Sequence, residues 1–397
     1  MSRLEKVFCL IKLFFASLIV RVFRRGLLRE NLWLFQEKHT EARDNGYHFY
    51  RYVKENHPEI KAYYSIVKGS PDAAKIEHYG TSINADSFKH YMYWVAAKYS
   101  INSQPYGAAP YPTYVLYRFR WLCRKDQKTV YLKHGVDKDE LPHVLDHDKT
   151  RFSLIAFVAD REKEFMQKMF GYPDGVAQLL GFCRYDRLST VPAPKKQILV
   201  MPTFRLWLTA KDNERQATEE EFARFRESDF YKNYQALLTN ADLLAAAGES
   251  GYQIVFYLHY SLQSYAKAFL PFQNETVVIA DREHYDVQQL LMESAAMVTD
   301  FSSVFFDFAY MRKPEVFFQF DEDTYRKGHY KQGYFEYRRD GFGPVYTTAE
   351  EVSGKLIALM KSGCVMDPEY LAKVDSFFAF FDNQNCERTF QAVQHLE

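Results

Sequence analysis

Short apolar runs alternate with segments of helical periodicity along most of the chain. In the first half, strand-like runs cover residues 60–67, 99–102, 129–132, 154–158 and 177–180, and helical segments cover residues 47–54, 88–97 and 161–170. In the second half, the strand-like runs are residues 198–201, 254–258, 276–280, 296–299 and 315–318. Helical segments lie at 287–294, after Ser303 and at 350–360, and residues 211–227 form a polar loop and helix. Such alternation is typical of α/β units built on parallel sheets.

The alternation restarts once, which predicts two domains. A chain of 397 residues exceeds what one ordinary hydrophobic core holds. Residues 190–196 contain two prolines and two lysines and mark the boundary. We therefore predict an α/β fold with two Rossmann-like domains, residues 30–190 and 197–397, that face a cleft. Ligands in such folds bind beyond the carboxyl ends of the strands.

Residues 1–29 form a separate segment with a strongly basic character. They carry seven lysines and arginines against a single acidic residue, Glu5. The longest uncharged run covers residues 13–20, whereas a membrane-spanning helix needs about 20 apolar residues. Apolar residues recur at helical spacing, which predicts an amphipathic helix in the interface of an anionic membrane. The alternative is a first helix docked on the core with a solvated basic end. The apolar positions are Val7, Leu10, Ile11, Phe14, Leu18 and Val22.

Composition excludes several protein classes. Lys plus Arg and Asp plus Glu each number 51, which argues against a generally basic nucleic-acid binder. Five scattered cysteines without a C-x-x-C pair indicate neither a disulfide framework nor a zinc site, as in a reducing cytoplasm. The unusual quantity is the aromatic content of 17%, and we expect part of it to line the cleft.

Polar residues follow the predicted strands, where an α/β enzyme builds its site. His134 precedes Gly135 and could accept a proton from an attacking hydroxyl, and His259 could be a second acid or base or a phosphate donor. For either histidine, the alternative is a hydrogen-bonded structural residue. The remaining candidates after strands are Arg184, Asp186, Thr203, Arg205, Asp300, Ser302 and Ser303.

Ser302 and Ser303 are the sharpest phosphate candidates. They lie at the predicted start of a helix, where free N–H groups attract anions. Simple N-capping explains them equally well. Arg205 carries a planar fork suited to phosphate, or forms a salt bridge to a neighbouring helix. Arg184 and Asp186 could instead pair with each other as a structural clamp.

Common catalytic fingerprints are absent, including the P-loop, the dinucleotide G-x-G-x-x-G, H-E-x-x-H and G-x-S-x-G. Three D-x-D pairs occur, at residues 137–139, 146–148 and 321–323. Such a pair can bridge a metal to a diphosphate, but we interpret all three as solvated loops and predict no metal site.

An ordered series of motifs runs through most of the chain. It comprises residues 31–35, 56–58, Lys133-His134-Gly135, 181–188, 201–205, Tyr285-Asp286-Val287-Gln288-Gln289-Leu290-Leu291, 298–308 with Thr299-Asp300-Phe301-Ser302-Ser303 and Asp307, Arg312-Lys313-Pro314 and Gly333-Tyr334. In this order the motifs resemble the CDP-glycerol glycerophosphotransferase family, which builds teichoic acids and related capsule polymers.

The resemblance implies a GT-B-like pair of Rossmann-type domains and a peripheral enzyme on the cytoplasmic face of the membrane. It implies metal-independent transfer of an alditol phosphate from CDP-glycerol or another CDP-alditol to a lipid-linked or polymeric acceptor, with CMP released and no cofactor. By resemblance, His134 is the base that activates the acceptor hydroxyl, with His259 as its catalytic partner. The diphosphate and nucleotide are held by Arg205, Thr203, Asp300, Ser302, Ser303 and His259, with Gly135, Arg184, Asp186 and Asp307 in support.

The chain departs from the family pattern around the acceptor-side motifs. Lys133 replaces the tryptophan before the His-Gly pair, Val136-Asp137 replaces Thr-Pro, Cys183 replaces a proline, and Tyr260 replaces the proline after His259. The sequence leaves the alditol, the acceptor and homo-oligomer formation open. Two alternative functions remain: a GT-B glycosyltransferase that uses a nucleotide sugar for a cell-envelope glycan, and a non-catalytic, membrane-attached nucleotide-binding protein.

Overall fold

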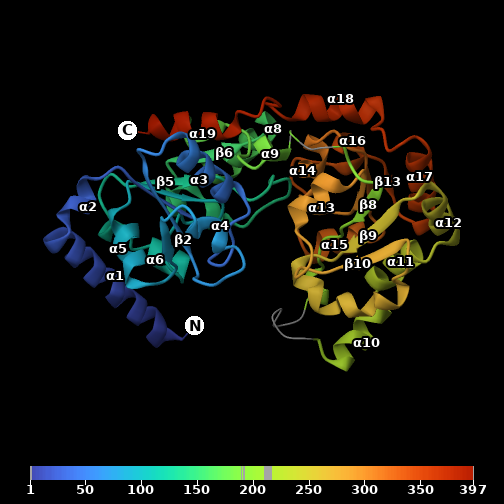
Figure 1. Cartoon of the computed structure of the whole chain (residues 1–397), viewed down its shortest axis with the longest axis horizontal. Coiled ribbons are helices and arrows are strands. Elements are labelled where there is room, and N and C mark those ends of the chain that lie inside the picture. The colour runs from blue at the N-terminus through green and yellow to red at the C-terminus, as the bar shows by residue number, and fades with distance from the viewer. Residues whose placement is uncertain (1, 189, 191–192, 210–216, 397) are drawn as a thin grey trace. The chain divides into compact units, whose positions relative to one another are not determined.

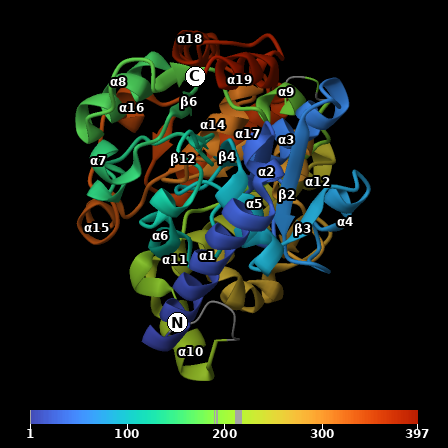
Figure 2. The same cartoon turned by 90° about the vertical axis from the view of Figure 1, so that its left-hand side faces the viewer.

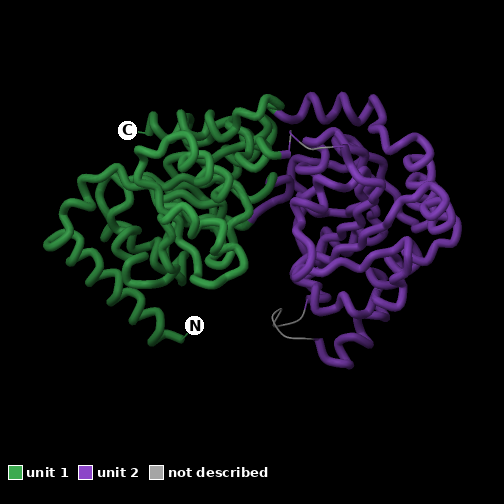
Figure 3. The backbone as a smooth tube through the Cα atoms, in the orientation of Figure 1, with its two compact units in different colours: residues 1–136, 142–187, 379–397 green, residues 137–141, 188–378 purple. Residues whose placement is uncertain are grey.

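The computed structural model describes residues 2–188, 190, 193–209 and 217–396. The chain forms two compact units (Figure 3). Unit 1 comprises residues 1–136, 142–187 and 379–397, and unit 2 comprises residues 137–141 and 188–378. Residues 191–192 of the predicted boundary and 210–216 of the predicted polar loop lie outside the described residues.

Unit 1 is built on a parallel sheet of seven strands in the order β3-β2-β1-β4-β5-β6-β7. Figure 1 labels β2, β5 and β6 of this sheet. The chain moves outward from β1 through β2 to β3, and then continues on the other side of β1 with β4. Polar loops after β1 and β4 therefore diverge at a switch point, the usual ligand-binding place in such sheets. The strands are β1 (Leu32–Gln36), β2 (Lys61–Ile66), β3 (Ser82–Asn84), β4 (Tyr99–Asn102), β5 (Lys128–Tyr131), β6 (Leu154–Phe157) and β7 (Ala177–Leu179).

Helices cover the sheet of unit 1 because its central strands are apolar on both faces; β1 and β4, for example, are buried along their whole length. The helices are α1 (Arg3–Phe23), α2 (Arg25–Arg29), α3 (Asn45–Asn56), α4 (Ala74–Glu77), α5 (Phe88–Ala96), α6 (Thr113–Tyr117), η1 (Arg120–Leu122), η2 (His143–Leu145), α7 (His147–Thr150), α8 (Asp160–Phe170), α9 (Tyr185–Leu188) and α19 (Asn385–Gln394).

Unit 2 repeats the architecture with six parallel strands in the order β10-β9-β8-β11-β12-β13, and its switch point lies between β8 and β11. The two Rossmann-like sheets confirm the predicted fold class. The strands are β8 (Gln197–Val200), β9 (Gln253–Tyr257), β10 (Val277–Ala280), β11 (Ala296–Thr299), β12 (Glu315–Phe318) and β13 (Val345–Tyr346). The helices are η3 (Leu206–Leu208), α10 (Glu219–Glu227), α11 (Asp229–Leu238), α12 (Ala241–Ser250), η4 (Tyr260–Ala268), η5 (Leu270–Phe272), α13 (Val287–Glu293), α14 (Phe305–Tyr310), α15 (Glu322–Gly328), α16 (Tyr337–Asp340), α17 (Ala349–Lys361) and α18 (Pro368–Phe377).

The C-terminal segment does not stay with the second unit, as residues 197–397 were expected to do. Residues 379–397 return to unit 1, where α19 packs on α3. The ring of Phe390 in α19 lies 5.7 Å from that of Trp33 in β1. The backbone N–H groups of Asn385 and Cys386 donate to the Asp186 carboxylate at 2.9 and 2.8 Å. Asp186 therefore holds the start of α19, which satisfies N–H groups that a helix start leaves unpaired.

Helix α1 packs against α5 through a narrow stripe and leaves most of its apolar surface exposed. Leu13, Ala16, Ser17 and Val20 are its buried residues, and Figure 2 shows α1 running beside α5. The exposed large apolar residues of α1 are Leu4, Val7, Phe8, Ile11, Phe14, Phe15, Leu18, Val22 and Phe23. Among the described residues, no helix is both long and apolar enough to cross a bilayer.

Aromatic residues form much of the core of unit 2. Phe301, Phe305, Phe306 and Phe308 are buried around the Asp300-Phe301-Ser302-Ser303 motif. Tyr325 and Tyr337 are also buried, so these six aromatic side chains belong to the core of unit 2. The ring of Tyr325 stacks on that of Phe301 with centroids 4.0 Å apart.

Burial of His90 predicts acid sensitivity of unit 1. Its imidazole is fully buried on α5, accepts the Asp86 N–H at 3.1 Å and lies 3.0 Å from the Ala108 carbonyl oxygen. Burial lowers its pKa from 6.5 to about 4. Between pH 4 and pH 6.5 the unfolded chain therefore binds a proton at His90 that the folded chain does not bind. The contribution of the neutral His90 to the free energy of unfolding is complete above pH 6.5 and is lost as the pH falls to about 4.

We expect the wild-type protein to lose about 3 kcal/mol more unfolding free energy over that window than the variant His90→Gln. Urea denaturation at a series of pH values measures the difference between the two proteins. Parallel pH profiles for the two proteins would contradict the assignment.

Candidate active site

His134 lies on the bend that follows strand β5 in unit 1. Its side chain is exposed, and among the described residues no hydrogen bond, ion pair or ring contact reaches its imidazole. The preceding residue, Lys133, has a left-handed backbone with φ of 60°, which turns the chain at the strand end. An unpartnered imidazole at the carboxyl end of a parallel strand is available to a ligand.

Asn45 at the start of α3 fixes the backbone beneath His134. Its side-chain Nδ2 donates to the Lys133 carbonyl oxygen at 2.8 Å, and its Oδ1 accepts the Arg184 N–H at 3.1 Å. One buried amide thus joins the Lys133-His134-Gly135 turn to the Arg184 segment. Asn45 is not predictable from the motifs that follow strands, because it lies at the start of a helix.

A buried ion pair supports the same turn. The Lys133 ammonium bonds to the Glu162 carboxylate of α8, and both side chains are fully buried. The Lys133 Nζ also lies 4.5 Å from the centroid of the Phe157 ring. Lys133, which stands where the family has a tryptophan, therefore points into unit 1 and is paired there.

Arg184 and Asp186 each bond to a different part of unit 1, which the clamp considered from the sequence did not include. Arg184 is buried and its Nη1 lies 2.9 Å from the Asp44 carboxylate. Asp186 accepts from Asn385 and Cys386 of α19. Arg184 therefore bonds to the start of α3, whereas Asp186, two positions later, accepts the N–H groups at the start of α19.

Arg205 in unit 2 lies at the centre of a buried carboxylate network. Its Nε and Nη2 donate to the two carboxylate oxygens of Asp321 at 2.8 and 2.9 Å. Its Nη1 lies 2.9 Å from Asp300 Oδ2. The guanidinium is fully buried, so in this structure Arg205 forms the salt bridge that the sequence left as the alternative to phosphate binding.

Asp300 and Thr203 belong to that network. Asp300 is fully buried and accepts the Thr203 N–H at 2.8 Å. Burial raises the pKa of Asp300, and the Arg205 charge opposes this rise. Together, Asp300 and Arg205 join the chain after β8 to the chain after β11, across the switch point of the sheet.

Ser302 and Ser303 lie just before α14, close to the helix start predicted after Ser303. The helix begins at Phe305, and Ser302 Oγ accepts the Val304 N–H at 3.4 Å. Both serines are half-buried. In the described part of the chain, the Ser303 hydroxyl has no hydrogen-bond partner. A free hydroxyl at this strand end is available to a phosphate oxygen.

His259 follows β9 and packs in an aromatic cluster. Its Nδ1 accepts the Ser261 N–H at 3.3 Å, which places the proton of the neutral ring on Nε2. The Phe204 ring lies between His259 and His329, with centroids 4.6 Å from each. Burial and the Arg205 charge lower the pKa of His329 to about 4, so that ring is neutral at physiological pH.

His329, which packs beside Phe204, is a second residue that no sequence motif predicted. It lies between Gly328 and Tyr330, after α15, and follows no predicted strand. Its two ring nitrogens are buried and have no hydrogen-bond partner among the described residues. Its place beside Phe204 depends on tertiary packing, and no local motif marks it.

Two of the three D-x-D pairs are not the solvated loops that we expected. Asp321 of the third pair accepts from the buried Arg205. Asp139 of the first pair is buried in unit 2, bonds to the Lys138 ammonium and accepts from Arg326 Nη1 at 2.6 Å. Asp139 also pairs with Gln332 in an isolated antiparallel bridge. Lys138 and Asp139 thus anchor residues 137–141 within unit 2.

The comparisons with known proteins agree with the motif series. A family model described as CDP-Glycerol:Poly(glycerophosphate) glycerophosphotransferase matches residues 17–395. The minor teichoic acid biosynthesis protein GgaB of Bacillus subtilis (strain 168) is 29% identical over 372 residues, which cover 93% of this chain and 40% of that protein. The teichoic acid poly(glycerol phosphate) polymerase of the same strain is 27% identical, over 84% of this chain and 43% of that protein. The chain thus spans about two fifths of the length of these curated relatives.

Solved structures share the fold. The wall teichoic acid polymerase TagF matches with a TM-score of 0.66 at 18% identity, over 100% of both chains. A putative UDP-N-acetylglucosamine 2-epimerase from Listeria monocytogenes matches with a TM-score of 0.54 at 10% identity, over 92% of this chain and 96% of that chain. At these identities the likeness establishes the fold alone.

Proposed function

This chain belongs to the CDP-glycerol:poly(glycerophosphate) glycerophosphotransferase family, and we propose on that premise that it transfers an alditol phosphate from a CDP-alditol to a hydroxyl of a cell-surface polymer or its lipid-linked primer. The relatives named above act in teichoic acid biosynthesis. One TagF structure was obtained after a soak with CDPG. The observation that carries the proposal is the exposed His134 at the end of β5, whose imidazole has no partner among the residues that the structure describes.

The proposed reaction is a direct phosphoryl displacement. An imidazole nitrogen of His134 accepts the proton of the acceptor hydroxyl. The acceptor oxygen bonds to the phosphorus that carries the alditol, and the phosphoanhydride bond to CMP breaks. CMP leaves with the bonding electron pair. Positioned donors supply most of the stabilisation in such reactions; the Ser303 hydroxyl and the Nε2–H of His259 are the proposed donors to the diphosphate.

Arg205, Thr203 and Asp300 take a positioning role in this proposal. Their network holds the chain after β8 against the chain after β11. Asn45 joins the Lys133-His134-Gly135 turn to the Arg184 segment beneath His134, and Asp186 holds the start of α19. Asp307 and Gly135 stay supporting residues by family resemblance.

The product identifies the function. We expect CMP release when the protein is incubated with CDP-glycerol or CDP-ribitol and a polymeric or lipid-linked acceptor, with and without a chelator. Release of a nucleoside diphosphate from a nucleotide sugar would favour a glycosyltransferase instead. Absence of CMP from every CDP-alditol would overturn the proposal, and its loss with chelator would overturn the metal-free mechanism.

We also propose that α1 attaches the protein to the cytoplasmic face of an anionic membrane. Phe14 and Leu18 are 55% and 45% exposed on the helix. Basic residues flank this apolar surface, among them Lys12 and Arg21. Buried apolar side chains and electrostatic attraction to anionic lipid add together in interfacial helices.

The replacement Phe14→Gln with Leu18→Gln tests the attachment. Each apolar side chain contributes roughly 1.5–3 kcal/mol when fully buried, so we expect at least a tenfold loss of binding to phosphatidylglycerol vesicles in sedimentation. The matched control replaces Val365 and Leu270, which are 67% and 48% exposed in unit 2, by glutamine. Equal binding of both double variants would contradict the attachment.

A further inference from the structure

Unit 1 contains a large pocket outside the residues discussed above. Its volume is about 1010 Å³, and α6, η1 and the segment around α7 line it. Small-ligand pockets span about 300–1,000 Å³, so this one suits an extended ligand. Thr129 in the wall lies near the amino end of β5, whereas His134 follows its carboxyl end. The pocket is therefore separate from the His134 turn.

Positive charge dominates the wall of this pocket. Six of its lining residues are lysines or arginines, and Asp148 is the only acidic one among them. Arg124 and Lys149 are paired with Asp126 and Asp146 outside the wall. Among the described residues, the side chains of three cations have no hydrogen-bond or ion-pair partner: Arg118, Lys125 and Arg151.

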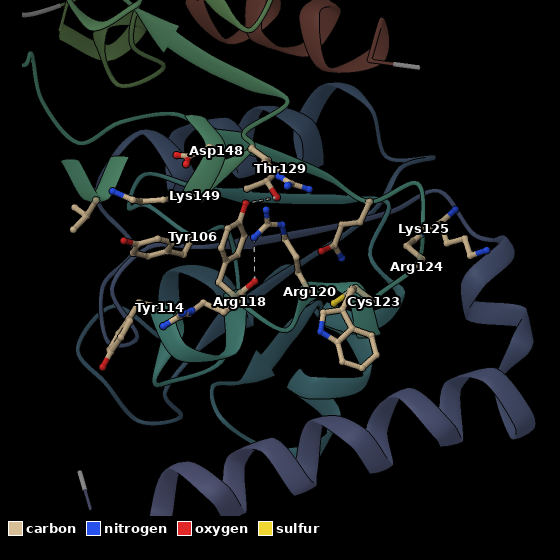
Figure 4. Close-up of a pocket in the computed structure, with 15 residues that line it drawn as sticks. Tyr106, Tyr114, Arg118, Arg120, Cys123, Arg124, Lys125, Thr129, Asp148 and Lys149 are labelled. Atoms are coloured by element: carbon tan, nitrogen blue, oxygen red, sulfur yellow. Dashed lines mark hydrogen bonds between the residues drawn. The ribbon is translucent and has the colours of Figure 1, made fainter. Parts of the chain in front are cut away.

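The cations are spread along the pocket. Figure 4 shows Tyr106 and Lys149 toward one end and Arg124 and Lys125 toward the other, with Arg120 between them. A converging set would suit one highly charged group such as a diphosphate. Spaced cations instead suit a chain of single negative charges, such as phosphodiesters.

Aromatic side chains occupy the space between the cations. Tyr114 and Trp121 are 52% and 71% exposed, which is unusual for rings of this size. Tyr106 has a left-handed backbone with φ of 78°, a strained conformation that the fold must stabilise. Its ring lies 5.5 Å from that of Tyr117. Such rings offer apolar faces to the carbon atoms of a polyol, and tyrosine hydroxyls bond to its oxygens.

We propose that this pocket binds a polyol phosphodiester chain. It would hold the acceptor through units of the chain that are remote from the hydroxyl that reacts. This inference rests on the proposed transferase function, which supplies such an acceptor. The ligand chemistry is shared by a soluble polymer and by the glycerophosphate headgroup of a lipid. The neighbouring α1 makes the distinction relevant, because Arg21 of α1 donates to the Cys123 carbonyl oxygen in the pocket wall at 2.9 Å.

The binding test uses a synthetic hexamer of glycerol phosphate and isothermal titration calorimetry. We expect Arg118→Gln with Arg151→Asn to weaken binding at least tenfold. The control pair Lys68→Ala with Lys168→Ala removes two positive charges from exposed positions of unit 1 outside the pocket, and we expect less than a twofold change. A second variant, Trp121→Ala, is expected to weaken binding without any change of charge. Circular dichroism verifies that each variant is folded.

Three further arms separate the sources and the outcomes. Inorganic phosphate tests a single ion, and we expect it to compete poorly with the hexamer. If the pocket pair, the double variant Arg118→Gln with Arg151→Asn, no longer binds phosphatidylglycerol vesicles but still binds the hexamer, the proposal of a soluble chain is overturned in favour of a lipid headgroup. CMP release is measured with the hexamer and with a one-unit acceptor. We expect this double variant to have a higher KM than the parent for the hexamer and an unchanged KM for the one-unit acceptor.

The transferase proposal and the pocket proposal fail in different ways. Equal hexamer affinity in the pocket pair and the control pair overturns the pocket, even if the parent releases CMP. Absence of CMP with every acceptor overturns the transferase, whereas hexamer affinity that depends on Arg118 and Arg151 still supports the pocket.

Discussion

We expect His134→Gln to lower kcat for CMP release by about 100- to 10,000-fold, the usual contribution of a positioned general base. Glutamine keeps a polar side chain of similar length but cannot accept the acceptor proton. The imidazole is exposed and unpartnered in the described part of the chain, so its removal breaks no contact. We therefore expect the melting temperature and the affinity for CDP to stay at the parent values.

The matched control is His78→Gln, which replaces another exposed histidine of unit 1 and should leave kcat within twofold of the parent. Initial rates of CMP release at saturating CDP-glycerol measure both variants, and calorimetry with CDP measures binding. A His134→Gln variant with the parent rate would remove the base from the mechanism. A variant that loses CDP binding in parallel would instead indicate a role in the donor site.

The fold was largely predictable because parallel strands buried on both faces appear in a sequence as short apolar runs. Strands β4 and β11 match the predicted runs residue for residue. The short edge strands β3 and β13 were missed, because two or three residues carry no measurable periodicity. The central strand β1 (Leu32–Gln36) was also missed, although all five of its residues are buried. The C-terminal helix was placed in the wrong unit because its attachment to Asp186 spans 199 residues of chain.

The positions of the candidate residues were predictable, but their partners were not. An arginine after a strand can reach outward to a phosphate or inward to a carboxylate. Arg205 pairs inward with Asp321, 116 residues away, and only tertiary packing decides that choice. Helix α1 shows the same limit, since it carries apolar residues on both its buried and its exposed sides and periodicity could not distinguish them.

The largest expected loss of stability comes from Glu162→Ala. This change removes a carboxylate partner of the fully buried Lys133 ammonium. Breaking a buried pair from one side typically costs about 3–5 kcal/mol, because the remaining charge stays desolvated. The nearby Phe157 ring contributes less than a carboxylate does. We expect the unfolding transition of unit 1 to lose free energy of that size.

Urea denaturation followed by tryptophan fluorescence measures this loss. The protein has four tryptophans, and Trp33, Trp94 and Trp121 lie in unit 1, so the variant Trp207→Phe makes the signal specific to that unit. Lys163→Ala is the matched control on the same helix, because it breaks an exposed pair with Asp160. Exposed pairs contribute about 0–1 kcal/mol.

The double variant Lys133→Met with Glu162→Leu distinguishes an unpaired charge from lost packing. Replacing a buried pair by apolar residues of similar size is often neutral or stabilising, so we expect the double variant to recover most of the stability lost in Glu162→Ala. A loss as large as in the single variant would show that packing, rather than charge, explains the effect. Lys133 directly precedes His134, so the single variant should also slow CMP release more than Lys163→Ala does. If the two single variants are equally active, the pair stabilises unit 1 without positioning His134.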